Sequence, residues 1–145
     1  MPTAPSDQPR CEILIVEDDP ATREMEARTL EREGWAVTEA ENGRVALERV
    51  SARRPGLILL DLMMPEMDGF TFAAELRKRP AWRTIPIIVV TAMDLTAEDR
   101  LRLNGQVAGI LQKGAYKQDE LFAEVRTLVD ACLRKPGARR TSTVM

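Results

Sequence analysis

The sequence predicts an α/β protein of the doubly wound class, with a five-stranded parallel sheet and helices on both faces. Short apolar segments alternate along the chain with stretches of helical periodicity, which is typical of successive βα units. Three of these segments, ILIV, LILL and IIVV, are apolar throughout, as expected for strands that are covered on both faces. Right-handed crossovers between such units produce a parallel sheet.

Five strands are predicted from the apolar segments. Their ranges are Glu12 to Val16, Ala36 to Ala40, Leu57 to Leu60, Ile87 to Thr91 and Gly109 to Gln112. The second segment alternates apolar and polar residues, and the fifth is short and mixed, so both suit the edges of the sheet. Strands one, three and four are then central, and the expected order is 2-1-3-4-5, as in flavodoxin-like folds.

Capping residues predict where the intervening helices begin and end. Asp19 before Pro20 is a typical N-cap, and the helix that follows should end at Gly34. Residues of the same kind are expected to start the next three helices: Asn42, Asp68, and Thr96 with Asp99. The last helix is predicted over residues 118–133, with one apolar stripe formed by Leu121, Val125, Leu128, Val129 and Cys132.

Length and charge indicate a single cytoplasmic domain. The 145 residues suit one domain, predicted over residues 11–134, with flexible tails at 1–10 and 135–145, the second of them basic. A net charge of -2 argues against broad binding of nucleic acid. No run is long enough to span a membrane, and the N-terminus lacks an apolar signal core. Histidine is absent, so any histidine chemistry must come from a partner.

Polar residues follow four of the predicted strands. They are Glu17, Asp18 and Asp19 after the first, Asp61 after the third, Thr91 at the end of the fourth and Lys113 after the fifth. In such folds, ligands bind at the carboxyl ends of the strands where the direction of winding reverses, here between strands one and three. Carboxylates would bind a divalent cation there, and a hydroxyl and an ammonium could hold an anion beside it. The pattern indicates phosphoryl transfer to an aspartate.

Each of these residues also has a simpler structural interpretation. Asp19 is better explained as a helix cap than as a ligand. Thr91 suits a strand by its β-branched shape alone, and Lys113 could be one more solvated lysine. Asp61 could form a turn, although a carboxylate at the end of a buried strand is costly without partners. The methionines of the following loop are expected to pack in the loop and core rather than to bind a soft metal: Met63, Met64 and Met67.

The segments ILIVEDDP, LLDLMMPEMDG and IPIIVVTA, followed by Lys113, resemble the receiver domain of two-component response regulators, the CheY-like superfamily. The resemblance covers about residues 11–134, with no output domain expected after it. It implies that Asp61 accepts a phosphoryl group from a phosphohistidine on a histidine kinase or a histidine phosphotransfer protein. The implied Mg²⁺ ligands are Asp18, Asp61 and the backbone carbonyl of Met63, with Glu17 acting mainly through water. Thr91 and Lys113 would contact phosphoryl oxygens.

Two positions depart from the family pattern. The family lysine is usually followed by proline in a cis peptide bond, whereas Gly114 follows Lys113 here, which leaves the geometry of this loop open. The aromatic residue that usually stands three positions before the lysine is replaced by Ile110, and the spacing leaves undecided whether Tyr116 occupies the same space. We expect a smaller conformational change on phosphorylation, or one carried by the loop of residues 114–116.

The predicted function is that of a phosphoacceptor in signalling and not of an enzyme. Phosphorylation would alter a surface formed by the helix after Thr96, the strand of residues 109–112 and the last helix, where an unidentified protein would bind. One alternative is a receiver-like interaction module that signals without phosphorylation. Another is a Mg²⁺-dependent phosphatase with an aspartyl nucleophile, although Met63 stands where such enzymes of the dehalogenase type carry a general acid.

Overall fold

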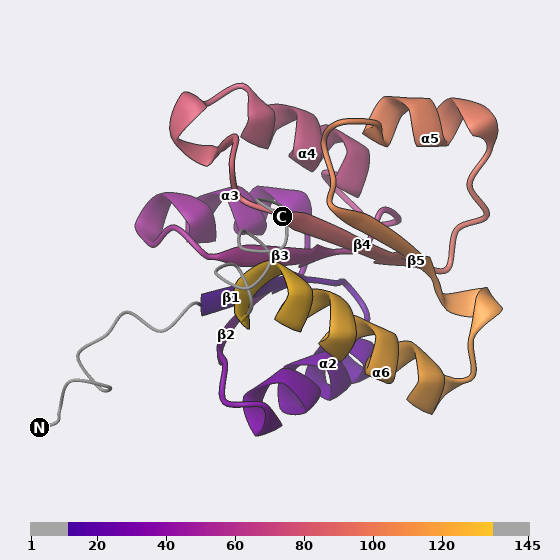
Figure 1. Ribbon diagram of the computed structural model, residues 1–145. Helices are drawn as coiled ribbons and strands as arrows, with labels where there is room; N and C mark the ends of the chain where they lie inside the picture. The colour runs from indigo at the N-terminus through magenta and orange to yellow at the C-terminus, as the bar shows by residue number, and fades with distance from the viewer. Residues whose placement is uncertain (1–11, 135–145) are drawn as a thin grey trace, which may run out of the picture.

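The computed structural model describes residues 12–134, which fold into a five-stranded parallel sheet between two layers of helices (Figure 1). The strands are β1 (Glu12–Val16), β2 (Ala36–Ala40), β3 (Leu57–Leu60), β4 (Ile87–Thr91) and β5 (Gly109–Gln112). Their order is β2-β1-β3-β4-β5, so the predicted fold class, strand ranges and strand order are confirmed. The predicted tails, residues 1–10 and 135–145, lie outside the described residues.

The helices cover both faces of the sheet, with α3, α4 and α5 on one side and α2 and α6 on the other (Figure 1). They are α2 (Pro20–Arg32), α3 (Gly43–Ala52), α4 (Gly69–Arg77), α5 (Ala97–Leu103) and α6 (Gln118–Val129). The short 3₁₀ turns η1 (Pro80–Trp82) and η2 (Lys113–Ala115) follow α4 and β5. Among the residues that the structure describes, no helix combines the length and the apolar character needed to cross a lipid bilayer.

The last helix differs in one respect from the prediction over residues 118–133. Regular α-helix ends at Val129, and Asp130–Arg134 continue as a wider π-helical turn. Cys132 and Leu133 on this turn still pack against the same apolar layer as Val129. The predicted apolar stripe is therefore correct, while the regularity of the final turn is not.

Side-chain caps hold the helix starts as predicted. Asp19, Asn42 and Asp68 each accept a hydrogen bond from the backbone N–H three residues on, at 2.9, 2.9 and 2.8 Å. Thr96 and Asp99 form a reciprocal capping box with both hydrogen bonds at 3.0 Å. A cap of this kind stabilises a helix by about 1 kcal/mol. The caps thereby define where the loops between strands and helices end.

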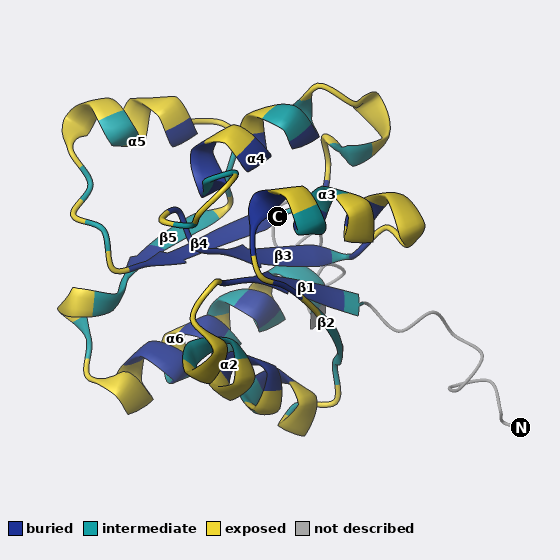
Figure 2. Cartoon of the chain, turned by 180° about the vertical axis from the view of Figure 1, so that it is seen from behind, coloured by how far each residue is buried: buried dark blue, intermediate teal, exposed yellow. Residues whose placement is uncertain are grey.

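Two apolar layers, one on each face of the sheet, form the core (Figure 2). The alternation along β4 shows this arrangement, because Ile87 and Val89 join the layer of α3, α4 and α5, whereas Ile88 and Val90 join that of α2 and α6. Burial of each such side chain contributes about 1.5–3 kcal/mol. The buried central strands therefore form a rigid frame, and the residues that follow them are held at fixed places.

The helix α5 is lightly attached to this frame. Of its seven residues only Leu103 is buried, and Leu101 is 71% exposed. The guanidinium of Arg102 lies over the ring of Phe70 in α4, 4.1 Å from the ring centroid. A few contacts thus determine where α5 sits.

Candidate functional site

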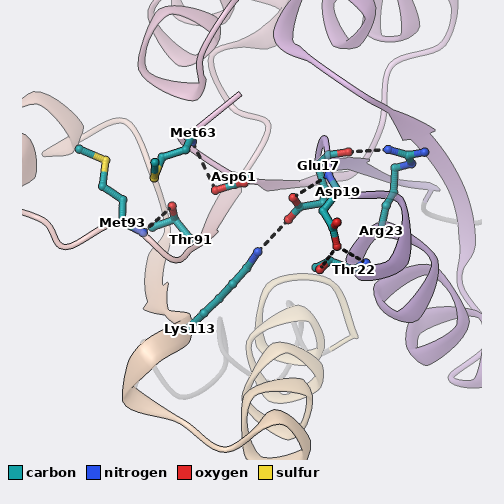
Figure 3. Close-up of polar contacts among 9 residues, drawn as sticks. All are labelled: Glu17, Asp19, Thr22, Arg23, Asp61, Met63, Thr91, Met93 and Lys113. Atoms are coloured by element: carbon teal, nitrogen blue, oxygen red, sulfur yellow. Dashed lines mark hydrogen bonds and ion pairs between the residues drawn. The ribbon is translucent and has the colours of Figure 1, made fainter. Parts of the chain in front are cut away.

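Four strand ends place polar side chains at the carboxyl edge of the sheet (Figure 3). Glu17 follows β1 and Asp61 follows β3, and the N–H of Asp61 donates to the carbonyl of Val16 at 3.0 Å, so these two ends adjoin. Thr91 ends β4, and Lys113 comes directly after β5. The structure thus brings together the residues that the sequence places after separate strands.

Three carboxylates form a cluster at this edge. One oxygen from each of Glu17, Asp18 and Asp61 lies within 4.8 Å of the others. Glu17 and Asp61 are buried, with 2% and 7% of their surface exposed, whereas Asp18 is exposed. Carboxylates this close repel one another unless a cation lies among them. Oxygen ligands from two or three carboxylates suit Mg²⁺, which keeps several of its waters, so the donor set fits a divalent cation.

Lys113 reaches the cluster through Glu17. Its Nζ lies 2.9 Å from Oε1 of Glu17 in a partly buried ion pair (Figure 3). Burial and the charge of Asp61 raise the pKa of Glu17 to about 7, against the opposing effect of Lys113. Burial alone would lower the pKa of Lys113, but the hydrogen bond and the charge of Glu17 raise it. The ammonium is therefore charged at neutral pH and lies beside the carboxylate cluster.

The start of α2 fixes the backbone around Glu17. The N–H of Asp19 donates to Oε2 of Glu17 at 3.2 Å, and Nη1 of Arg23 donates to the carbonyl of Glu17 at 2.7 Å. The carboxylate of Asp19 itself accepts from the N–H and the hydroxyl of Thr22. The interpretation of Asp19 as a helix cap is therefore confirmed.

Backbone N–H groups contact both Asp61 and Thr91. The N–H of Met63 donates to Oδ1 of Asp61 over 3.4 Å, and the N–H of Met93 donates to Oγ1 of Thr91 over 3.2 Å (Figure 3). The first contact is long and holds Asp61 only weakly. A threonine hydroxyl that accepts one hydrogen bond can still donate another, so Thr91 can serve as a donor to a bound anion.

Methionines surround the opening of the site. A cavity of about 460 Å³ beside Asp18 is lined by Leu62, Met63, Met64, Pro65, Asp68, Phe70 and Met93. Met64 and Met67 pack against the core as expected, whereas Met63 is 56% exposed and does not. Met63 lies in the loop after β3, where no core surface covers it. Thioether side chains are weak hydrogen-bond acceptors, so the methionines at this opening are poorly suited to orienting water.

The structure around the end of β5 shows the geometry of the Lys113–Gly114 peptide bond and the places of Ile110 and Tyr116. The peptide bond between Lys113 and Gly114 is trans. Ile110 packs against the apolar layer of α3, α4 and α5, whereas Tyr116 packs against that of α2 and α6. The sheet lies between the two side chains, so Tyr116 does not occupy the place of the missing aromatic ring.

Glu26 of α2 is a buried carboxyl that sequence reasoning missed. Glu26 is only 2% exposed, and this burial raises the pKa of its carboxyl to about 8. The charges of Glu17 and Asp61 also raise this pKa, whereas the charge of Lys113 lowers it. Residues four apart share a helix face, and Glu26 stands four before the buried Leu30. That spacing was the available signal.

Glu26→Gln is expected to remove part of the pH dependence of stability. A carboxyl whose pKa rises from 4.5 to about 8 on folding contributes stability that is complete below pH 4.5 and is lost as the pH rises through about 8. In that window the parent protein should lose up to about 1.4 kcal/mol of unfolding free energy per pH unit from this group. Urea unfolding at about pH 6 and about pH 8 measures the slope. The control is Glu31→Gln on the exposed side of α2, and equal slopes in all three proteins would contradict the prediction.

A family model described as the response regulator receiver domain matches residues 13–126. The chain belongs to this family of signalling domains, which act in two-component systems. The response regulator MprA of Mycolicibacterium vanbaalenii is 34% identical over 132 residues, which are 91% of this chain and 56% of that protein. The DNA-binding dual master transcriptional regulator RpaA of Synechocystis is 32% identical over 133 residues, 92% of this chain and 55% of that protein. The chain thus spans about half the length of these relatives.

Solved structures with the same fold include receiver domains of several sources. The receiver domain of a signal transduction histidine kinase from Syntrophus aciditrophicus has a TM-score of 0.71 and 36% identity, covering 86% of this chain and 93% of that one. The Mn²⁺-bound response regulator Rcp1 has a TM-score of 0.74 and 26% identity, with 84% and 93% coverage. The phosphorylated cyanobacterial phytochrome response regulator RcpA has a TM-score of 0.75 and 27% identity, with 86% and 94% coverage.

Proposed function

We propose that this chain is a phosphoacceptor that takes a phosphoryl group onto Asp61 from a phosphohistidine of a partner protein. The observation that supports this most strongly is the cluster of Glu17, Asp18 and Asp61 beside Lys113, in a chain of the receiver family. The donor would be a histidine kinase or a histidine phosphotransfer protein, because response regulators receive phosphoryl groups from histidine kinases and this sequence has no histidine to carry the group itself.

In this proposal Asp61 supplies the nucleophile. One of its carboxylate oxygens attacks phosphorus, and the new P–O bond forms as the P–N bond to the imidazole breaks. The imidazole keeps the electron pair of the broken bond, and because its other nitrogen carries a proton it leaves as a neutral ring. Asp18, Asp61 and the backbone carbonyl of Met63 would hold Mg²⁺ directly, and Glu17 would act mainly through water. Bound Mg²⁺ supplies positive charge between the carboxylates and the phosphoryl oxygens.

Lys113 and Thr91 would bind oxygens of the phosphoryl group after its transfer to Asp61. The Nζ of Lys113, now paired with Glu17, would gain a phosphoryl oxygen as a second negative partner. The hydroxyl of Thr91 would donate to another phosphoryl oxygen, which would alter its contact with the N–H of Met93. The loop after β4 would shift with it. The surface of α5, β5 and α6 would then change for a downstream protein.

Incubation with acetyl phosphate and Mg²⁺ tests the proposal. A phosphoacceptor gives a lasting covalent adduct, which appears as the mass gain of one phosphoryl group. An interaction module that works without phosphorylation gives no adduct. A phosphatase with an aspartyl nucleophile gives continuous release of phosphate, with little adduct at any time. Only the first result agrees with the proposed function.

The apolar opening predicts a long-lived phosphoryl adduct. Hydrolysis of phosphorylated Asp61 needs a water in line with the breaking bond, and neither Met63 nor Met93 can orient one. Met63→Asn combined with Met93→Glu should therefore shorten the lifetime several-fold and up to about tenfold, which is about 1.4 kcal/mol of barrier. The decay of the adduct after removal of acetyl phosphate, followed by intact mass, measures this.

The control for the lifetime is Leu101→Asn, a polar substitution at an exposed apolar residue on α5. It should leave the decay rate unchanged. A double variant that is phosphorylated normally and loses phosphate at the parent rate would show that the opening does not limit hydrolysis.

A further inference from the structure

Gln112 at the end of β5 lies beside Thr91. The two residues are register partners in adjacent parallel strands, so their side chains leave the sheet on the same face. Side chains alternate along a strand, which places Gln112 on the face of Ile110 and opposite Leu111. Ile110 packs in the layer of α3, α4 and α5, and Leu111 in the other layer. Gln112 therefore stands two residues beyond Ile110, nearer the candidate site.

The amide of Gln112 joins the loop after β4 to α5. Its Nε2 donates to the carbonyl of Met93 at 3.0 Å, and its Oε1 accepts from Nη2 of Arg100 in α5 at 3.0 Å. Both partners agree with this orientation of the amide, because a carbonyl can only accept and a guanidinium can only donate. The N–H of Met93 donates in turn to Oγ1 of Thr91. Three hydrogen bonds thus run without interruption from Thr91 to α5.

We propose that Gln112 is a positioning residue that transmits the state of Thr91 to α5 through Met93 and Arg100. The proposal rests on the proposed function, since the signal is the phosphoryl group on Asp61. When the hydroxyl of Thr91 turns toward a phosphoryl oxygen, its bond with Met93 changes and the carbonyl of Met93 moves. The amide of Gln112 then shifts with the carbonyl of Met93, and Arg100 shifts with the amide that it contacts.

Two further observations favour this route. A cavity of about 290 Å³, lined by Ala92, Asp94, Gln112, Gly114 and Ala115, leaves space for the loop and the amide to move. The helix at the far end has a single buried residue, Leu103, and one ring contact, that of Arg102 with Phe70, so the loss of a further side-chain contact is a substantial change for it. Ile110 has no polar side-chain atom and cannot join such a chain of hydrogen bonds.

Two substitutions of Gln112 separate transmission from simple anchoring of α5. Gln112→Met removes both hydrogen bonds at similar volume. Gln112→Glu keeps the acceptor for Arg100 but loses the donor to Met93. Amide NMR shifts and hydrogen exchange of residues 97–103 are recorded with Mg²⁺, before and after addition of beryllofluoride as a phosphoryl mimic.

In the parent protein the mimic should shift the amides of both the loop 92–95 and α5. In Gln112→Met the loop should still respond, α5 should exchange faster before the mimic is added, and the further response of α5 should fall below half. In Gln112→Glu α5 should stay protected, because the pair with Arg100 remains, yet its response should also fall below half. A residue that merely anchors α5 would leave the response of Gln112→Glu unchanged, and that result would overturn the proposal.

A control variant, a replacement variant and the adduct assay complete this experiment. Arg28→Met, which removes an exposed ion pair with Glu24 in α2, is the control and should respond as the parent does. If the amides of β1 and β3 lose their protection from hydrogen exchange in Gln112→Met, that variant has not kept its fold. Arg100→Met is then used instead, because this substitution breaks the same route from the side of α5. All variants should form the adduct with acetyl phosphate. A parent protein without adduct contradicts the proposed function, whereas normal adducts with a full α5 response in both glutamine variants contradict the role of Gln112.

Discussion

Asp61→Asn is expected to abolish the covalent adduct that acetyl phosphate and Mg²⁺ form with the parent protein. An asparagine amide has nearly the shape of the carboxylate but is not a nucleophile of this kind, so no aspartyl phosphate can form. The fold should remain, because removal of one of the clustered, buried charges relieves repulsion with Glu17. Intact mass after incubation measures the adduct, and circular dichroism checks the fold.

Asp68→Asn is the matched control for this experiment. Asp68 lines the same cavity as Asp18, but its side chain caps α4 by accepting from the N–H of Thr71. Asparagine caps helices about as well as aspartate, so the structure should be kept. The control should form the adduct as the parent does. An adduct that persists in Asp61→Asn would move the phosphorylated residue elsewhere.

Asp18→Ala is expected to weaken both Mg²⁺ binding and phosphoryl transfer. Asp18 is the exposed member of the carboxylate cluster, so its loss removes charge and one oxygen ligand while the buried core stays intact. The parent protein should bind Mg²⁺ weakly before phosphorylation. The variant should bind it about tenfold more weakly or worse, in the range seen when groups that support a metal site are removed. Isothermal titration with Mg²⁺, and the rate of adduct formation, are the two measurements.

Asp19→Asn provides the comparison at the neighbouring position. Asp19 does not belong to the cluster of Glu17, Asp18 and Asp61. It caps α2, a role that asparagine can also fill. Binding and transfer should therefore change little. Unchanged transfer in Asp18→Ala would remove the metal role assigned to Asp18.

The strands and the helix starts could be predicted from sequence because their causes are local. A run such as ILIV is apolar because both of its faces are covered, and Asp19, Asn42 and Asp68 cap helices through contacts only three residues long. The strand order followed from which runs were apolar throughout, and it placed Asp61 beside the end of β1.

The remaining features depend on contacts between distant parts of the chain. The proposed role of Gln112 depends on its hydrogen bonds with Met93 and Arg100, which are 19 and 12 residues away in sequence. Tyr116 and Ile110 are separated by the sheet, which spacing along the chain cannot reveal. Glu26 is buried although glutamate is usually exposed, because α2 packs its face against the sheet and α6.

The light attachment of α5 also bears on how such a protein can diversify. The residues that face solvent on α5, such as Leu101, add little to the core, so exchanging them should cost about 0.5 kcal/mol or less in most cases. The end of β3 that carries Asp61 has no such freedom, since Leu60 and Leu62 on either side of Asp61 are buried. Mutation can therefore change the partner-binding surface that we propose on α5 while the acidic pocket stays as it is. New signalling pathways could arise from this scaffold by changes confined to one short helix.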